Sequence, residues 1–243
     1  MEPKVIFEDN DLLVLDKPAG MIVNKSDTTK DQTTVQDWVE TKLKVKSEKL
    51  KVDEESDFYR RAGIVHRLDK ETSGILLVAK TLSAFTNLQA QFKERKVQKT
   101  YVALAHGKIE PIEGEINVSV GRLPWNRKRF GVLSGGREAV TKYKTINNLQ
   151  LTINNEPLTF VELYPQTGRT HQIRVHLQYI HHPIFSDPLY GGRKTSRNDR
   201  KILPRVFLHA AKISFMHPKT NKPLFFESPL PAELNNFLKG LKA

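Results

Sequence analysis

A dense polar segment that contains the carboxylates Asp69 and Glu71 is a candidate for catalytic chemistry in this chain. Residues 66–74 read His-Arg-Leu-Asp-Lys-Glu-Thr-Ser-Gly, and residues 75–79 are continuously apolar. Such an apolar run is typical of a strand that is buried on both faces. A polar loop that leads into this strand places its side chains at the mouth of a core, so we expect a catalytic carboxylate here.

A second polar segment, residues 167–174, contains two arginines that are placed to face a carboxylate. It lies at the start of a predicted helix, residues 170–180, where Gly168 permits a tight turn and backbone N–H groups are free. The arginines are Arg169 and Arg174. Spacing alone favours a simpler alternative, in which both arginines pair with acids at the surface.

The elements around these segments predict an α+β fold. Apolar residues at helical spacing indicate helices at residues 34–45, 82–92, 170–180 and 231–241. A hairpin opens the chain, and the other predicted strands are residues 75–79, 101–105, 116–120, 139–146, 158–163, 208–215 and 224–227. We therefore expect a mixed, mostly antiparallel sheet, with helices and loops around a central cleft. Residues 46–60 are rich in charge and predict an exposed loop or insertion.

The charge of the chain favours a polyanionic partner. It has 39 Lys and Arg against 27 Asp and Glu, a formal net charge of +12, and 38% hydrophobic residues, enough for a folded core. Two basic stretches, residues 122–130 and 193–205, lie in turn-like sequence, where cations with interleaved aromatic rings suit RNA. The alternative is a solvated surface. The cations that we expect to contact RNA are Arg122, Arg127, Lys128, Arg129, Arg193, Lys194, Arg197, Arg200 and Lys201.

Several classes of site are excluded or disfavoured by composition and spacing. The chain has no Cys, which excludes disulfides, Cys-ligated zinc, iron–sulfur clusters and thiol catalysis. His171 and His176 are five positions apart, whereas two ligands on one helix face are four apart, so we expect no metal. The glycine pairs lack a nucleotide-binding pattern, and no cofactor is expected. No apolar run is long enough for a membrane helix, and we expect a cytoplasmic protein.

Residues 66–74 resemble the signature of the RluA-type pseudouridine synthase family, which reads His-Arg-Leu-Asp, two variable residues, then Thr-Ser-Gly before an apolar strand. The resemblance extends, in order, to residues 17–20, 99–101, 167–177 and 187–191. Five such motifs in order are highly specific. One departure is Ser186, where the family usually has glycine. The other is that no additional N-terminal RNA-binding module precedes the hairpin, so we expect residues 1–243 to form a single catalytic domain.

The resemblance implies an RNA pseudouridine synthase, an isomerase that needs no cofactor. Such an enzyme breaks the N1 glycosidic bond of a uridine, turns the uracil and joins C5 to the sugar. It implies that Asp69 is the essential carboxylate, as a nucleophile or a base. Arg169 is then its ion-pair partner. Tyr101 is then the active-site tyrosine, which stacks on the base and takes part in proton traffic.

The same resemblance implies how the substrate is held. The target uridine is flipped out of structured RNA, ribosomal or transfer RNA, and Arg67 enters the vacated space. His66, Ile173 and Arg174 are further candidates for substrate binding, although a core role is about as well supported for Ile173. We expect a monomer with no obligate protein partner. The alternatives are a noncatalytic RNA-binding or folding factor on the same scaffold, and a glycosylase that releases uracil.

Overall fold

The computed structural model describes residues 2–26, 29, 31–43, 56–127, 129–146, 151–153 and 156–241. It divides into two compact units, each assembled from two separate stretches of chain. Unit 1 comprises Met1–Gln98 and Lys212–Ser228, and unit 2 comprises Lys99–Ala211 and Pro229–Ala243. The chain therefore passes between the units three times.

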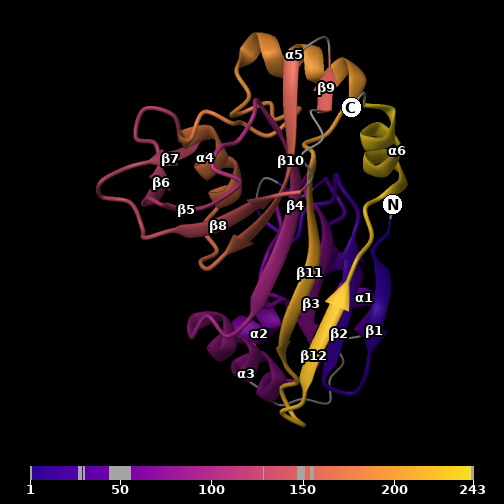
Figure 1. The fold of residues 1–243 in the computed structure, drawn as a ribbon. Helices are drawn as coiled ribbons and strands as arrows, with labels where there is room; N and C mark the ends of the chain where they lie inside the picture. The colour runs from indigo at the N-terminus through magenta and orange to yellow at the C-terminus, as the bar shows by residue number, and fades with distance from the viewer. Residues whose placement is uncertain are drawn as a thin grey trace. The chain divides into compact units, whose positions relative to one another are not determined.

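Unit 1 contains an antiparallel arrangement of the first three strands. β1 (Lys4–Glu8) pairs with β2 (Leu12–Lys17), which pairs with β3 (Ser73–Ala79), and they lie side by side in Figure 1. β12 (Pro223–Glu227) pairs with the part of β11 (Leu208–Met216) that belongs to this unit. Its helices are α1 (Val35–Leu43), α2 (Asp57–Arg60) and α3 (Leu82–Lys93).

Local polar contacts explain where the elements of unit 1 begin. Asp9 accepts hydrogen bonds from the backbone N–H groups of Asp11 and Leu12, which closes the β1–β2 turn. Thr81 caps α3 because its hydroxyl accepts from the N–H of Ala84. All seven residues of β3 are buried, as expected for a strand that is covered on both faces.

Unit 2 contains a larger set of antiparallel strands. The strand order is β4 (Gln98–His106), β10 (Glu156–Pro165), β8 (Val140–Thr145) and β5 (Glu113–Asn117), with β9 (Leu151–Ile153) paired to β10. A separate hairpin consists of β6 (Val120–Arg122) and β7 (Phe130–Val132). The helices are α4 (Gln172–Tyr179), α5 (Arg193–Ile202) and α6 (Ala232–Gly240).

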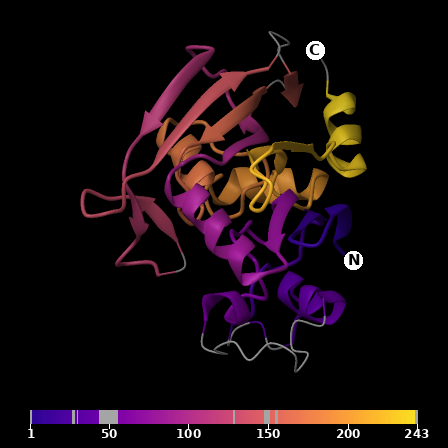
Figure 2. The ribbon, with the colours of Figure 1, turned by 90° about the horizontal axis from the view of Figure 1, so that it is seen from below.

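The core of unit 2 depends on its last helix. Leu234 of α6 is fully buried, and the ring of Phe237 lies 5.1 Å from Phe185 and 6.1 Å from Phe207 between centroids. Figure 2 shows α6 in yellow, near the C-terminus. The C-terminal helix therefore completes a core whose strands β4, β5, β8 and β10 all end more than 60 residues earlier in the chain.

The predicted α+β class with a mostly antiparallel sheet is confirmed, and three local predictions are corrected. Residues 193–205 are not turn-like, because Arg193–Ile202 forms α5. Within the predicted exposed loop, residues 46–55 lie outside the described part of the chain, and Asp57–Arg60 forms α2, whose Phe58 is buried. The predicted strand 116–120 spans the end of β5 and the start of β6. The single-domain expectation stays a prediction.

Candidate functional site

The loop that carries Asp69 is tied to the end of β2 by a fully buried lysine. The ammonium of Lys17 donates hydrogen bonds to the carbonyl oxygens of Pro18 at 2.9 Å, Met21 at 2.8 Å and Lys70 at 3.1 Å. A buried ammonium has three donors, and here three backbone acceptors receive them. Because Lys70 follows Asp69 directly, Lys17 fixes the backbone next to the half-buried Asp69 side chain.

His66 and Arg67, which precede Asp69, differ in exposure. Nε2 of His66 accepts a hydrogen bond from the Leu77 N–H at 3.0 Å, and its ring lies 5.0 Å from Phe92. His66 therefore joins the loop to β3 within unit 1, while Arg67 is exposed. Their predicted contacts with substrate stay predictions.

In unit 2, the amide of Gln172 holds the turn that precedes α4. Its Oε1 accepts hydrogen bonds from the Thr167 hydroxyl at 2.7 Å and from the Arg169 N–H at 3.0 Å. Its Nε2 donates to Val140 O and Thr141 Oγ1, both at 3.0 Å, in β8. This buried amide fixes the backbone of Arg169. This role of Gln172 could not be predicted from the sequence, because two of its four partners lie on β8, about 30 residues away.

The Arg169 side chain is oriented by the segment that leads into β8. Its Nε donates to the carbonyl of Glu138 at 3.0 Å. Arg169 belongs to unit 2 and Asp69 to unit 1, so the predicted ion pair between them, and a central cleft that holds both, stay predictions.

Arg174 forms a buried ion pair. Its Nε and Nη2 donate to the two carboxylate oxygens of Asp187 at 2.7 and 2.9 Å, and only 7% of Arg174 and none of Asp187 is exposed. Asp187 Oδ1 also accepts from the N–H groups of Leu189 and Tyr190. We therefore assign Arg174 a structural role in this ion pair, and its predicted contact with substrate stays a prediction. Its partner is a buried acid rather than a surface acid.

Tyr190 connects this ion pair to the β6–β7 hairpin. Its hydroxyl accepts from the Phe130 N–H at 3.1 Å and is hydrogen-bonded to Nδ1 of His171 at 2.9 Å. The guanidinium carbons of Arg129 and Arg174 lie 5.3 and 5.1 Å from the Tyr190 ring centroid. Burial raises the pKa of Tyr190, so its hydroxyl stays protonated. Tyr190 thereby fixes the hairpin against the start of α4.

The other predicted residues of unit 2 lie on β4 and α4. Tyr101 on β4 is half-buried beside the unit 2 core, and Ile173 is part of that core. Ile173 therefore fills the core role that the sequence left open, and a contact with the base stays a prediction. Burial lowers the pKa of Lys99 to about 8, and its ammonium donates to Thr167 O at 3.4 Å. Lys99 thus links the start of β4 to the turn before α4.

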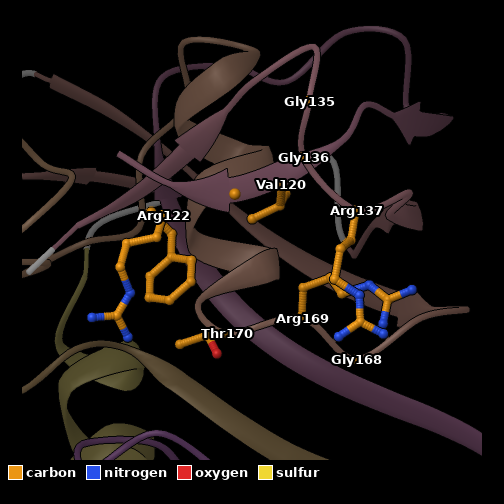
Figure 3. Close-up of a pocket in the computed structure, with 10 residues that line it drawn as sticks. Val120, Arg122, Gly135, Gly136, Arg137, Gly168, Arg169 and Thr170 are labelled. Atoms are coloured by element: carbon orange, nitrogen blue, oxygen red, sulfur yellow. The ribbon is translucent and has the colours of Figure 1, made fainter. Parts of the chain in front are cut away.

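A hollow of about 310 Å³ in unit 2, here called the arginine hollow, contains Arg169. Its walls also include Arg122 and Phe130 of the hairpin, Arg137 and Thr170. In Figure 3, Arg137 and Arg169 project from one side of the hollow and Arg122 from the other. The Arg122 guanidinium carbon lies 5.2 Å from the Phe130 ring centroid. This combination of cations and an aromatic ring suits a phosphate and a base.

The basic stretches divide into exposed and structural cations. Arg127 is exposed and its carbonyl accepts from Arg122 Nη1 at 3.1 Å, whereas Lys128 lies outside the described residues. On α5, four cations are exposed: Arg193, Lys194, Arg197 and Lys201. Arg200 instead donates to Ser186 O at 3.3 Å and Pro204 O at 2.7 Å, which fixes the loop before α5. RNA contact by these residues stays a prediction, and Arg200 has a structural role.

Among the residues that the structure describes, no cluster of three or more His, Asp or Glu side chains is arranged to hold a metal ion. No helix in this part of the chain has the length and apolar character needed to cross a membrane.

Comparison with known proteins gives consistent matches in sequence. The family described as RNA pseudouridylate synthase matches residues 11–179. Ribosomal large subunit pseudouridine synthase D of Neisseria meningitidis serogroup B is 38% identical over 245 residues, which cover 98% of this chain and 61% of that protein. An uncharacterized RNA pseudouridine synthase of Mycoplasma genitalium is 36% identical, with 98% of this chain and 70% of that protein covered.

Comparison of structures supports the fold. Human RNA pseudouridylate synthase domain containing 1 superposes with a TM-score of 0.70 at 26% identity, over 97% of this chain and 87% of that chain. The present chain spans about three fifths of the length of the Neisseria protein.

Proposed function

The chain belongs to the RNA pseudouridylate synthase family, and on this premise we propose that it isomerises uridine to pseudouridine in structured RNA. The similar Neisseria protein is named for the large ribosomal subunit, so ribosomal RNA is the first substrate to test. The observation that carries the proposal is the arginine hollow, where Arg169 lies with two other arginines and Phe130. Its volume is at the lower end of the range of about 300 to 1,000 Å³ for small-molecule sites and suits one nucleotide.

In the proposed reaction, Asp69 acts on the flipped nucleotide, and Arg169 is the proposed ion-pair partner of the Asp69 carboxylate. The N1 glycosidic bond breaks, the uracil turns and C5 bonds to C1′. The C5 proton leaves to solvent and N1 takes up a proton from solvent, so that the product is an isomer of uridine. Lys17 supports this step from unit 1 by holding the carbonyl of Lys70. Gln172 supports it from unit 2 by holding the Arg169 backbone. Flipping costs a few kcal/mol, which contacts from Arg67 and the basic surface offset.

The test is Asp69→Asn, which keeps the size of the side chain and removes its charge. Ribosomal RNA that carries 5-tritiated uridine, from cells that lack the protein, is incubated with excess enzyme, and tritium release is measured together with RNA affinity. We expect binding to survive and tritium release to stop. The matched control is Glu71→Gln, which neutralises a half-buried carboxylate two positions away in the same loop and should leave turnover intact.

Product analysis distinguishes the proposal from its rivals. Pseudouridine supports it, unchanged RNA indicates a noncatalytic binding factor, and free uracil indicates a glycosylase. Substantial single-turnover isomerisation by pure Asp69→Asn would remove this residue from the catalytic role.

A further inference from the structure

A second hollow in unit 2 brings together the two basic stretches, which are far apart in the sequence. Its volume is about 370 Å³, and its walls include Arg129 from the hairpin and Arg193 from α5. Tyr190, Gln178 and Ser196 contribute polar groups to the same walls. We call it the α5 hollow. It shares no lining residue with the arginine hollow. The hairpin contributes Phe130 to the arginine hollow and Arg129 to the α5 hollow.

Arg129 is held in place but is incompletely satisfied. Its guanidinium carbon lies 5.3 Å from the ring centroid of Tyr190, a residue fixed by the Phe130 and His171 contacts. Its Nε is buried and has no hydrogen-bond partner among the described residues. A buried donor without an acceptor is costly, so the contacts within the described residues leave this guanidinium incompletely satisfied.

The charge around the α5 hollow has one sign. No acidic residue lines it among the described residues. The two buried acids of the neighbouring segments are already paired: Asp187 with Arg174, and Asp199 with His106 at 2.8 Å and the Ser186 N–H at 3.1 Å. The arginines of the hollow therefore have no carboxylate on its walls to neutralise them.

The first turn of α5 adds to this imbalance. It begins with Arg193 and Lys194, contains no acid, and has no side-chain cap at Gly192. Cations are unfavourable at a helix N-terminus because the backbone dipole is already positive there. The Ser196 hydroxyl donates to Gly192 O, so it does not cap the turn either. The arrangement costs stability in the isolated chain and becomes favourable when an anion is bound.

We propose that the α5 hollow binds one phosphodiester of the RNA, at a linkage other than that of the nucleotide in the arginine hollow. Arg129 and Arg193 bind this phosphate together, since planar guanidinium groups match phosphate oxygens. Because both arginines bind the same phosphate, losing either one should remove this contact, and losing the second should have no further effect on RNA affinity. This inference rests on the proposed function, and it adds a second contact that positions the RNA.

The test measures how RNA affinity depends on salt. The probe is a fluorescein-labelled RNA hairpin with a uridine-rich loop, and the variants are Arg129→Met, Arg193→Met and the double variant. One lost phosphate contact in single-stranded RNA flattens the slope of log affinity against log salt by about 0.7. We expect this change from each single variant and no further change from the double variant. The matched control is Arg197→Met, an exposed arginine on α5 that is not on the walls of the hollow, with a smaller effect.

A flattening of about 1.4 in the double variant would mean two separate phosphates and would overturn the shared site. Unchanged slopes in all variants would overturn it entirely. Arg193→Met keeps the test valid if Arg129→Met fails to fold, because Arg193 is exposed.

A second measurement identifies the source of the phosphate. We would measure the affinity of the wild type and of Arg193→Met for RNA hairpins that each carry one neutral methylphosphonate linkage. We expect one linkage whose neutralisation weakens wild-type binding and leaves the variant unaffected. Inorganic phosphate that binds through both arginines while RNA shows no such linkage would assign the hollow to free phosphate and overturn the proposal.

Isomerisation by the wild type is measured in parallel. Absent isomerisation with arginine-dependent slopes would refute the proposed function and leave this site standing. Normal isomerisation with unchanged slopes would support the proposed function and refute the phosphate site in the α5 hollow.

Discussion

Replacing Arg174 by Met removes one partner of the buried ion pair in unit 2. The pair consists of two parallel hydrogen bonds, 2.7 and 2.9 Å long, to a carboxylate with no exposed surface. After the change, Asp187 keeps its bonds to two backbone N–H groups but loses its counter-charge. Removing one partner of a buried pair costs about 3 to 5 kcal/mol of folding free energy. At about 2 to 4 °C per kcal/mol, the melting temperature should fall by roughly 6 to 20 °C.

The measurement is urea unfolding of the wild type and the variant, followed by tryptophan fluorescence and far-UV circular dichroism. The matched control is Lys144→Met, which breaks an exposed ion pair with Glu113 at 2.5 Å and should cost less than about 1 kcal/mol. The double variant Arg174→Met, Asp187→Asn should recover much of the loss, because no buried charge remains and the amide oxygen can still accept from the N–H groups of Leu189 and Tyr190. If Arg174→Met costs no more than the control, our account of this pair is wrong.

Two further predictions concern a buried ammonium and a buried imidazole. Lys17→Met leaves three carbonyls without their donor and should lower the free energy of unfolding by about 3 kcal/mol. At a temperature where the variant is folded, its single-turnover rate of isomerisation should fall more than its RNA affinity. A normal rate would contradict the link between Lys17 and the Asp69 loop. Burial lowers the pKa of His176 to about 4 from 6.5, so the unfolded chain binds the proton more readily and stability falls as pH drops from 6.5 through 4. The loss should reach about 3 kcal/mol, measured by urea unfolding across this range, and His176→Gln should show a flatter profile; equal profiles would exclude His176 as the cause.

The sequence predicted best those elements that bury a regular apolar pattern. The run before Lys80 is fully buried as β3, and the spacing of Leu82, Phe85 and Leu88 matches α3. These patterns report burial directly, because each apolar position corresponds to one covered face. The segment with Asp69 was also placed correctly, directly before β3.

α5 was missed because nothing apolar holds its inner face. The residues of α5 that are buried are Ser196 and Asp199, three positions apart. Asp199 attaches the helix through His106 and the Ser186 N–H, which are polar contacts from distant segments. A hydrophobic pattern cannot report such an attachment, and the stretch reads as a charged turn. α2 was missed for a similar reason, since Phe58 is its single buried residue.

The roles of individual arginines could not be separated from the sequence. Arg174 and Arg169 lie five positions apart in one motif, yet Arg174 pairs with a buried acid while Arg169 lines a hollow. Ser186 shows the same limit. It has a φ of +63°, a conformation that glycine adopts without strain, which explains why the related family usually has glycine there. Its hydroxyl donates to Leu203 O, a contact that glycine lacks.

The three passages of the chain between the units have a consequence for synthesis on the ribosome. Unit 1 lacks β12 and its paired segment of β11 until Lys212–Ser228 has been made, and unit 2 lacks α6 until Ala232–Gly240 has been made. At roughly 5 to 20 residues per second, the interval between Gln98 and Lys212 lasts about 6 to 23 s. During that time the nascent chain exposes unpaired strand edges and an incomplete core. Neither unit can finish folding before the other has begun, so this protein should depend on chaperones that shield nascent chains, more than a protein whose domains are consecutive segments.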